Sequence, residues 1–285
     1  MLSENCSSVA AVPDVKPLES LLMPRVAALY RYPLKGFTPE LCEVLTILPE
    51  GRVAGDRSLA LRFANAPVAD DQWCRKYEGV VLANTPGLAC LITEFDHQRL
   101  RLKISSGNSV IIDAGLDTAG RQRIVAALTE YVLGLDENPL RGHPERLPLK
   151  LIGDGITPRY QDNEAGQVTL HSRETLASAA AALRDPHMSE HRFRSNVAIE
   201  GVEAWAEQSW LGRVIRIGGV EFDVVKPKVR CLATHANPQT GERDLMVMQG
   251  LMRAFAQKEP TLGVGMLTRG AGGEIRVGDE VTLLP

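Results

Sequence analysis

The residues most able to do chemistry lie at positions 224–241, VVKPKVRCLATHANPQTG, where a cysteine follows three cations. Lys226, Lys228 and Arg230 precede Cys231. Nearby positive charges stabilise a thiolate, which is the form of cysteine that acts as a nucleophile or as a ligand for a soft metal. A buried, unreactive cysteine is the commoner fate of a free thiol, and the residue types alone slightly favour it.

A second charged group lies at positions 184–196, RDPHMSEHRFRSN. His187 and His191 are four residues apart, a spacing that places two imidazoles on one metal when the segment is a helix. A proline and the strand pattern that follows leave little room for a helix, so these histidines are predicted to lie in a solvated loop. Arg192 and Arg194 flank the start of the predicted strand and could bind an anion.

A third group of cations lies in the first half of the chain, in LYRYPLKGF and AGDRSLAL. Its members are Arg31, Lys35 and Arg57. Isolated charges usually pair on the surface, and Arg57 could pair with Asp56 or Glu50. Taken together, the three groups indicate several cations gathered around one thiol, which would suit a ligand that carries phosphate.

The cysteines of the 285-residue chain form no familiar cluster. There are five, at positions 6, 42, 74, 90 and 231, and no two form a CxxC pair. The usual zinc and iron–sulfur spacings are therefore missing, and an odd number of scattered cysteines is a poor basis for disulfides. The pattern is typical of a cytoplasmic protein whose thiols are mostly inert.

Composition and charge exclude several classes of protein. Lys and Arg number 32 against 35 Asp and Glu, a net charge of −3, which argues against a nucleic-acid binder. No apolar run approaches the roughly 20 residues that span a bilayer, so no membrane association is expected. The N-terminus lacks the basic and apolar segments of a secretory signal, and residues 1–25 are expected to form a flexible tail.

Common nucleotide-binding and hydrolase motifs are missing from the sequence. There is no GxGxxG at a helix start, no GxxxxGK[ST] phosphate loop and no GxSxG. The carboxylates are scattered, without the obvious acid/base pair of a glycosidase.

The elements that must position the three charged groups are mostly strands. In the first half, alternating or β-branched apolar residues predict strands at 26–33, 41–51, 57–63, 88–95, 100–105 and 109–113. The period then changes, and a helix is predicted over 120–134 with one apolar face, ending at Gly134. That face consists of Ile124, Ala127, Leu128, Tyr131 and Val132.

The second half mixes strands and helices. Strands are predicted at 168–172 and within 192–201, and Gly218-Gly219 predicts a hairpin over 213–227 whose second strand ends at Pro227. Ser172 is expected to cap a helix over 172–184, and Asp244 one over 244–258. A closing hairpin-like pair is expected at 274–285. Two β-rich units, the second with packed helices, give an α+β class.

Several of these segments resemble one known family. RYPLKG (31–36) and GDRSLAL (55–61) resemble the N-terminal β-barrel that precedes MOSC domains. The segments at 192–210, 224–242 and 262–284 resemble the MOSC domain itself. The resemblance implies a tail (1–25), a MOSC N-terminal β-barrel domain (26–115), a helix and linker (116–140), and a MOSC β-barrel domain with packed helices (141–285).

The family pattern implies a set of site residues. Cys231 falls on the position whose thiolate ligates molybdenum, with Arg230 before it among the cofactor-binding residues. Arg194 and Asn196 fall on an R-P-N motif that contacts the cofactor, with Ser195 in place of the proline. Asp162 matches the acidic residue beside the metal, in a catalytic role that it shares with Cys231.

Other positions of the pattern lie in the first half. Lys35 and Arg57 match the residues that hold the phosphate of molybdopterin. Gly36 stands where relatives often have serine, and Lys228 where some relatives have a further cysteine. One protein thiol is therefore expected at the metal.

The two-domain layout is similar to the amidoxime-reducing component and its bacterial relatives. The resemblance implies a cytoplasmic oxidoreductase that holds the molybdenum cofactor (molybdopterin) and reduces small N-hydroxylated compounds by oxygen-atom transfer. A separate electron-donor protein is expected, because the chain ends at Pro285 and has no clustered cysteines for an iron–sulfur cluster. No pyridoxal phosphate is expected.

Two alternatives share the same residues. A carrier or sulfur-trafficking module could hold the molybdenum cofactor, or a persulfide on Cys231, without turning over a small substrate. A scaffold with a basic groove and no metal is the third reading.

Overall fold

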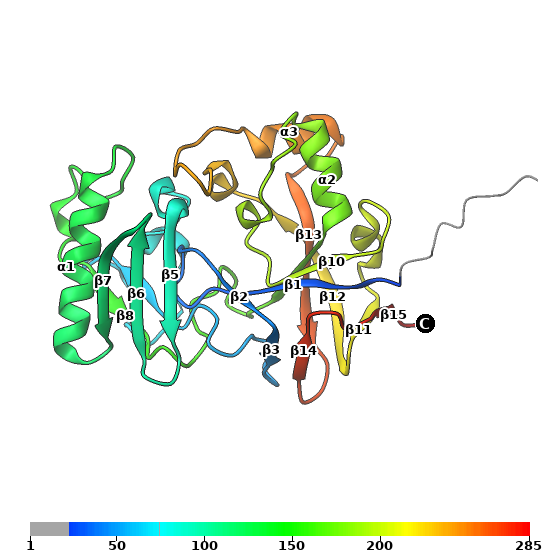
Figure 1. Cartoon of the computed structure of the whole chain (residues 1–285), viewed down its shortest axis with the longest axis horizontal. Helices are drawn as coiled ribbons and strands as arrows, with labels where there is room; N and C mark the ends of the chain where they lie inside the picture. Colours follow the sequence, from blue (N-terminus) through cyan, green and yellow to red (C-terminus); the bar gives the residue numbers. More distant parts are fainter. Residues whose placement is uncertain (1–22, 74) are drawn as a thin grey trace, which may run out of the picture.

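The computed structural model describes residues 23–73 and 75–285, and an eight-stranded sheet dominates the second half of the chain (Figure 1). Across this large sheet the strands lie in the order β15 (Val281–Leu283), β11 (Val214–Ile217), β12 (Val220–Val229), β13 (Thr261–Thr268), β9 (Val168–Ser172), β10 (Val197–Glu200), β1 (Arg25–Arg31) and β2 (Glu40–Cys42). β9 and β10 run parallel, and every other neighbouring pair is antiparallel.

Two apolar clusters stabilise the large sheet. One is formed by fully buried strand residues such as Leu170 of β9, Phe222 of β12 and Val264 of β13. The other lies beneath α2 (Arg173–Ala182) and α3 (Val247–Ala254), and α2 contacts β9, β10 and β13. The Ser172 hydroxyl accepts a hydrogen bond from the backbone N–H of Thr175 at 3.0 Å, which confirms the predicted cap.

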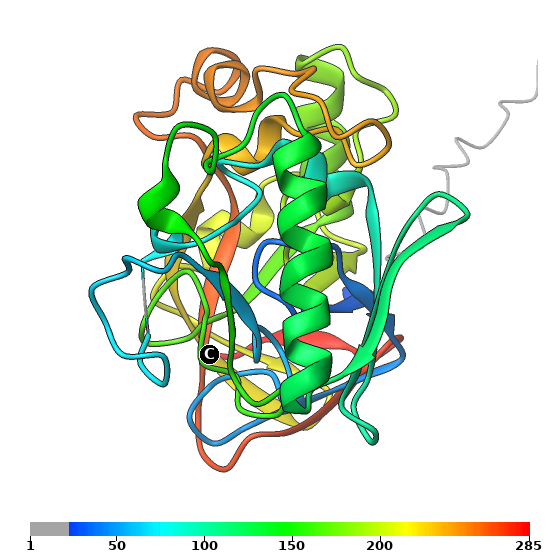
Figure 2. The same cartoon turned by 90° about the vertical axis from the view of Figure 1, so that its left-hand side faces the viewer.

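The first half contains a smaller antiparallel sheet against which α1 packs (Figure 2). Its strands are β5 (Leu91–Asp96), β6 (Arg101–Ser106) and β7 (Ser109–Gly115), and α1 spans Thr118–Gly134. Ile124, Leu128 and Val132 of α1 are fully buried, so the predicted apolar face and the end of the helix are confirmed. β4 (Ala60–Arg62) pairs with β8 (Lys150–Ile152).

Strands from the start of the chain complete the sheets of the second half. β1 pairs with β10, and β3 (Val44–Ile47) pairs with β14 (Gly273–Arg276). Of the expected tail over 1–25, residues 1–22 lie outside the described residues. The domain boundaries at 115 and 140 stay a prediction, and the four strands β1 to β4, which precede them, lie in sheets with strands of the second half.

The predicted α+β, β-rich class is confirmed, because the described residues form fifteen strands and three α-helices. Short 3-10 helices complete them: η1 (Lys76–Glu78), η2 (Pro86–Cys90), η3 (Pro144–Arg146), η4 (Glu190–Arg192), η5 (Ala206–Trp210) and η6 (Leu232–His235). Within the described part of the chain, none of the helices is both long and apolar enough to cross a bilayer.

Three local predictions were wrong. β12 continues through Pro227 to Val229, because irregular pairing with β13 on both sides accommodates a residue without an N–H. β14 and β15 pair with β3 and β11 and not with each other. α3 begins at Val247 rather than after Asp244, because that carboxylate binds Arg192 instead.

Arg192, at the end of η4, fixes the loop that follows Cys231. Its guanidinium donates to the backbone carbonyls of Thr234, His235 and Ala236 at 3.3, 3.1 and 3.0 Å, and to both carboxylate oxygens of Asp244 at 2.7 and 3.0 Å. The side chain is buried. Arg192 is therefore a structural cation that also lines the inner hollow, and anion binding by it stays a prediction.

Replacing Arg192 with alanine should lower the free energy of unfolding by about 3 kcal/mol, because three buried carbonyls and one carboxylate lose their donor. Urea unfolding followed by circular dichroism measures this change. The exposed Arg253 of α3 is the control, and Arg253→Ala should stay within about 0.5 kcal/mol of wild type. Equal stabilities of the two variants would contradict the structural role of Arg192.

Candidate functional site

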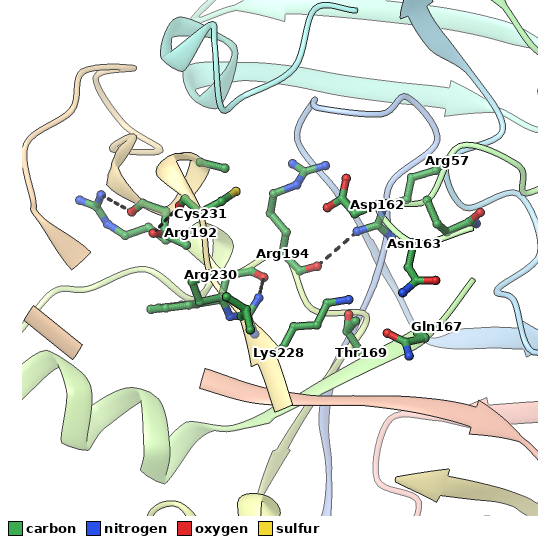
Figure 3. Close-up of a pocket in the computed structure, with 15 residues that line it drawn as sticks. Arg57, Asp162, Asn163, Gln167, Thr169, Arg192, Arg194, Lys228, Arg230 and Cys231 are labelled. Atoms are coloured by element: carbon green, nitrogen blue, oxygen red, sulfur yellow. Dashed lines mark hydrogen bonds between the residues drawn. The ribbon is translucent and has the colours of Figure 1, made fainter. Parts of the chain in front are cut away.

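Three hollows adjoin at Cys231 and Asp162, and each is lined by both residues. The inner hollow, of about 70 Å³, lies between the start of β10 and the end of β12, and includes Gln167 and Thr169 (Figure 3). The side hollow, of about 40 Å³, is lined by Lys35 and the turn after it. The outer hollow, of about 510 Å³, lies between the end of β12 and a wall made of Trp73 and residues 75–77.

Asp162 is the carboxylate at this junction. Enclosure by the protein favours its neutral form, but Lys35, Arg57, Arg194 and Lys228 more than offset this and hold the pKa of Asp162 below its usual value. Its side chain still reaches solvent through the hollows. Asp162 is therefore ionised at neutral pH and accepts hydrogen bonds rather than donating them.

Arg57 and Arg194 are both held against the ring of Tyr32. Their guanidinium carbons lie 4.6 and 4.3 Å from the ring centroid, and the ring is buried. Arg57 also pairs with Asp56. The predicted partner Asp56 is confirmed. The prediction that this ion pair lies on the surface was wrong, because the Arg57 side chain is only 7% exposed.

The backbone at both arginines is strained. Arg57 has a φ of 50° and Arg194 a φ of 52°, in the left-handed region that favours glycine. Such conformations persist where the surrounding structure imposes them, and they concentrate at functional sites. The hydrogen bond from Arg57 Nη2 to the Arg194 carbonyl, at 3.4 Å, joins the two strained positions (Figure 3).

Lys35 approaches the same place from the turn after β1. It is buried, and its Nζ donates to the carbonyl of Gln161 at 3.5 Å. Gly36 follows with a φ of +88°, and a Cβ there would come within 2.8 Å of Val81 Cα. This close approach requires glycine, which explains why serine is missing at position 36.

Lys228 lies on β12, and Arg230 directly follows that strand. Burial, reinforced by the nearby charge of Arg230, lowers the pKa of Lys228 to about 8. Arg230 donates to the carbonyls of Leu262 and Phe193, and burial lowers its pKa to about 10. Arg230 thus lines the inner hollow with its donors already bound to backbone, so it contributes charge more than hydrogen bonds to a ligand.

Cys231 is half-buried at the start of η6. Its carbonyl accepts hydrogen bonds from the N–H and the hydroxyl of Thr234, at 3.0 and 2.9 Å, which fixes the turn beneath the sulfur. Lys76 of η1 lies beside the thiol. Burial disfavours the charged form of Lys76. The nearby Cys231, followed in size of effect by Tyr77 and Asp162, outweighs burial, so the pKa of Lys76 is raised.

Sequence reasoning missed Lys76, since residues 64–79 carry no strand or helix pattern that would point to a site. It did predict Asn196, but this side chain is fully buried and lies outside the three hollows. Asn196 accepts from the Thr169 hydroxyl at 3.1 Å and donates to Asp56 at 3.3 Å. Asn196 therefore helps to hold Asp56, the ion-pair partner of Arg57, in place.

The remaining candidates lie elsewhere. His187 and His191 are exposed, as predicted, and His191 contacts the ring of Tyr30 edge-on. Arg31 pairs with Glu40. Among residues 23–73 and 75–285, no three His, Cys, Asp or Glu side chains are grouped as a metal site. Cys6 and Cys74 lie outside the described residues.

Two glutamines of the inner hollow each have a buried carbonyl oxygen without a partner in the described part of the chain. Gln161 Oε1 and Gln167 Oε1 are buried without a hydrogen-bond partner among the described residues, and both side chains line the inner hollow. An unpaired buried acceptor is costly unless a donor reaches it. A ligand with N–H groups would supply that donor if the two side chains turned their oxygens toward the hollow.

Residues 157–282 match the family model of the MOSC domain, and the chain therefore contains a MOSC domain. Asp162, Arg194, Lys228 and Cys231 lie within the matched segment. Lys35 lies before it, in the half of the chain that the family model does not match.

Two curated human proteins match parts of the chain. One is mitochondrial amidoxime-reducing component 1, 28% identical over 145 residues, which covers 47% of this chain and 42% of that protein. The other is molybdenum cofactor sulfurase, 36% identical over 75 residues, which covers 26% of this chain and 8% of that protein. The chain thus matches less than half the length of either relative.

Solved structures with similar arrangements were also found. The YuaD protein from Bacillus subtilis has a TM-score of 0.42 at 12% identity, covering 91% of this chain and 94% of that one. YiiM from Geobacillus stearothermophilus has a TM-score of 0.31 at 18% identity, covering 41% and 54%.

The pKa of Lys228 predicts how anion binding depends on pH. Below about pH 8 the amine is charged and attracts an anion, and above it the charge is lost. Sulfate, whose own charge is constant, should therefore bind about tenfold more weakly at pH 9.5 than at pH 7, as isothermal titration calorimetry can measure.

The matched variant is Lys228→Arg, which keeps its charge at both pH values. It should bind sulfate equally well at pH 7 and pH 9.5. The same loss of affinity in this variant would show that another group causes the pH dependence.

Proposed function

We propose that this protein holds the molybdenum cofactor at the junction of the three hollows, with its phosphate in the side hollow, and reduces small N-hydroxylated compounds. The observation that carries the proposal is a single half-buried thiol, Cys231, at the junction of hollows lined by cations from both halves of the chain. The names of the two human relatives, an amidoxime-reducing component and a molybdenum cofactor sulfurase, support the choice of cofactor.

The residues present fit this cofactor in charge and in hydrogen bonding. Lys35, Arg57 and Arg194 line the side hollow and would hold a phosphate, whose charge near −2 needs several fixed cations. The buried amide oxygens of Gln161 and Gln167, which lack a partner among the described residues, would turn to accept hydrogen bonds from the N–H groups of a pterin. Cys231 would supply one sulfur ligand, and the cofactor itself must supply the others.

The reaction needs two electrons and two protons for each substrate. The N–O bond of N–OH breaks, an N–H bond forms and water leaves. When bound, the cofactor would supply the chemistry of oxygen-atom transfer, and a separate donor protein would supply the two electrons. Among this chain's residues, ionised Asp162 would accept a hydrogen bond from the substrate, and Lys228 would carry a proton toward the departing oxygen.

Cys231→Ala should lower the rate of amidoxime reduction at least about 100-fold, because loss of the sulfur donor changes the geometry and potential of the metal. The rate is measured with the full chain from a host that makes the cofactor, with reduced viologen as electron donor. Cys42→Ala and Cys90→Ala, which alter the two other half-buried cysteines, are the controls and should retain the rate.

Wild-type turnover by Cys231→Ala would overturn the ligand assignment. A protein that binds the cofactor tightly but reduces no N-hydroxylated compound would instead be a carrier. The two outcomes are distinguished by measuring bound pterin in the same samples.

Arg194→Ala should lose most of its bound cofactor, since this arginine lines both the inner and the side hollow. It is a cleaner test than Arg57, whose removal would leave buried Asp56 without its partner and cost stability. Molybdenum per folded protein is measured with circular dichroism as the check on folding.

The control for this measurement is Arg31→Ala, which removes a cation that pairs with Glu40 instead of lining these hollows. Full molybdenum occupancy in Arg194→Ala would show that the phosphate lies elsewhere.

A further inference from the structure

The outer hollow offers a separate binding surface beside the thiol. Trp73 and residues 75–77 form one wall, the end of β12 forms the other, and Asp162 and Cys231 lie where it meets the inner hollow. At about 510 Å³ it has room for a small molecule. A compound bound there lies next to the sulfur without entering the side hollow.

Positive charge dominates this surface. Arg75, Lys76, Lys226 and Lys228 line the outer hollow, and none of the ion pairs found among the described residues involves any of them. Asp162 is the carboxylate among the lining residues, and its charge is already shared with three cations of the other hollows. The outer hollow therefore retains an excess of positive charge.

The cofactor would not use all of this charge. Its phosphate would be held in the side hollow, which Arg75 and Lys226 do not line. These two cations lie on opposite walls of the outer hollow, one before η1 and one on β12. They are available to a second anion.

Two aromatic rings face the same space. The indole N–H of Trp73 donates to the carbonyl of Gln161 at 2.8 Å, which fixes one ring in the wall. Tyr77 is 53% exposed, and Lys76 Nζ lies 5.2 Å from its ring centroid. Exposed aromatic faces favour planar groups, which they bind by stacking.

We infer, resting on the proposed function, that the preferred substrate is a planar N-hydroxylated compound that carries an acidic group. Lys226 and Arg75 bind the acidic group, and the rings of Trp73 and Tyr77 flank the planar part. The N–OH group then points to the junction at Cys231. The reaction is the same as in the proposed function. The N–OH group takes two electrons from the donor and two protons, and the products are N–H and water.

The test compares three amidoximes that differ in charge. The full-length holoprotein reduces benzamidoxime, its para-carboxylate or its para-aminomethyl cation, always with the same reduced viologen as donor. We expect kcat/KM to be highest for the carboxylate and lowest for the cation, about tenfold apart, and the difference to shrink in 0.5 M NaCl.

The variant Lys226→Ala should lower the ratio of kcat/KM for the carboxylate to that for benzamidoxime several-fold, mainly through KM. Lys258→Ala, which removes an exposed lysine outside the hollows, is the control and should leave this ratio unchanged.

Turnover of all three compounds with equal kcat/KM, or a preference for the cation, overturns the inference and leaves the proposed function standing. An equal change of all three rates in Lys226→Ala also overturns it, because the cation then acts on the electron donor. No turnover of any compound by molybdenum-loaded protein overturns the proposed function and the inference with it.

Discussion

Asp162 is surrounded by four cations, Lys35, Arg57, Arg194 and Lys228. Like charges repel, and the partial burial of these cations removes the screening that water would provide. The surrounding structure offsets part of this cost. The buried ring of Tyr32 contacts both guanidinium groups, Asp56 pairs with Arg57, and Asn196 holds Asp56 in turn. The two carboxylates Asp56 and Asp162 cannot neutralise four cations, so the arrangement is most stable with a bound anion. The strained backbone at Arg57 and Arg194 has the same explanation.

This constraint also explains why the two halves of the chain share strands. Lys35 follows β1, which pairs with β10, and Arg194 lies just before β10. The pairing thus brings the cations of the first half to the thiol of the second half, which no contact within either half could do. In our proposal the cofactor lies on the side of Lys35 and the substrate on the side of Lys226, and the two sides meet at Cys231.

The sequence predicted much of this arrangement and missed the rest for physical reasons. Lys35, Arg57, Asp162, Arg194 and Cys231 were expected together, and the structure brings them together, while their roles remain predictions. Strand and helix periods were visible because alternate burial leaves a pattern in the chain. Strand partners were not, since β14 and β15 pair with strands far from each other in sequence. Lys76 and the structural role of Arg192 depend on loops that only the tertiary fold positions.

The most direct measurement is the molybdenum and pterin content of the wild-type chain, purified from a host that makes the cofactor. Elemental analysis and the fluorescence of the oxidised pterin, released by denaturation, are taken on the same folded sample. Our account predicts one molybdenum and one pterin per chain, because the cations and the thiol together bind the cofactor. A properly folded protein that contains neither, from a host whose other molybdenum enzymes are loaded, would contradict it.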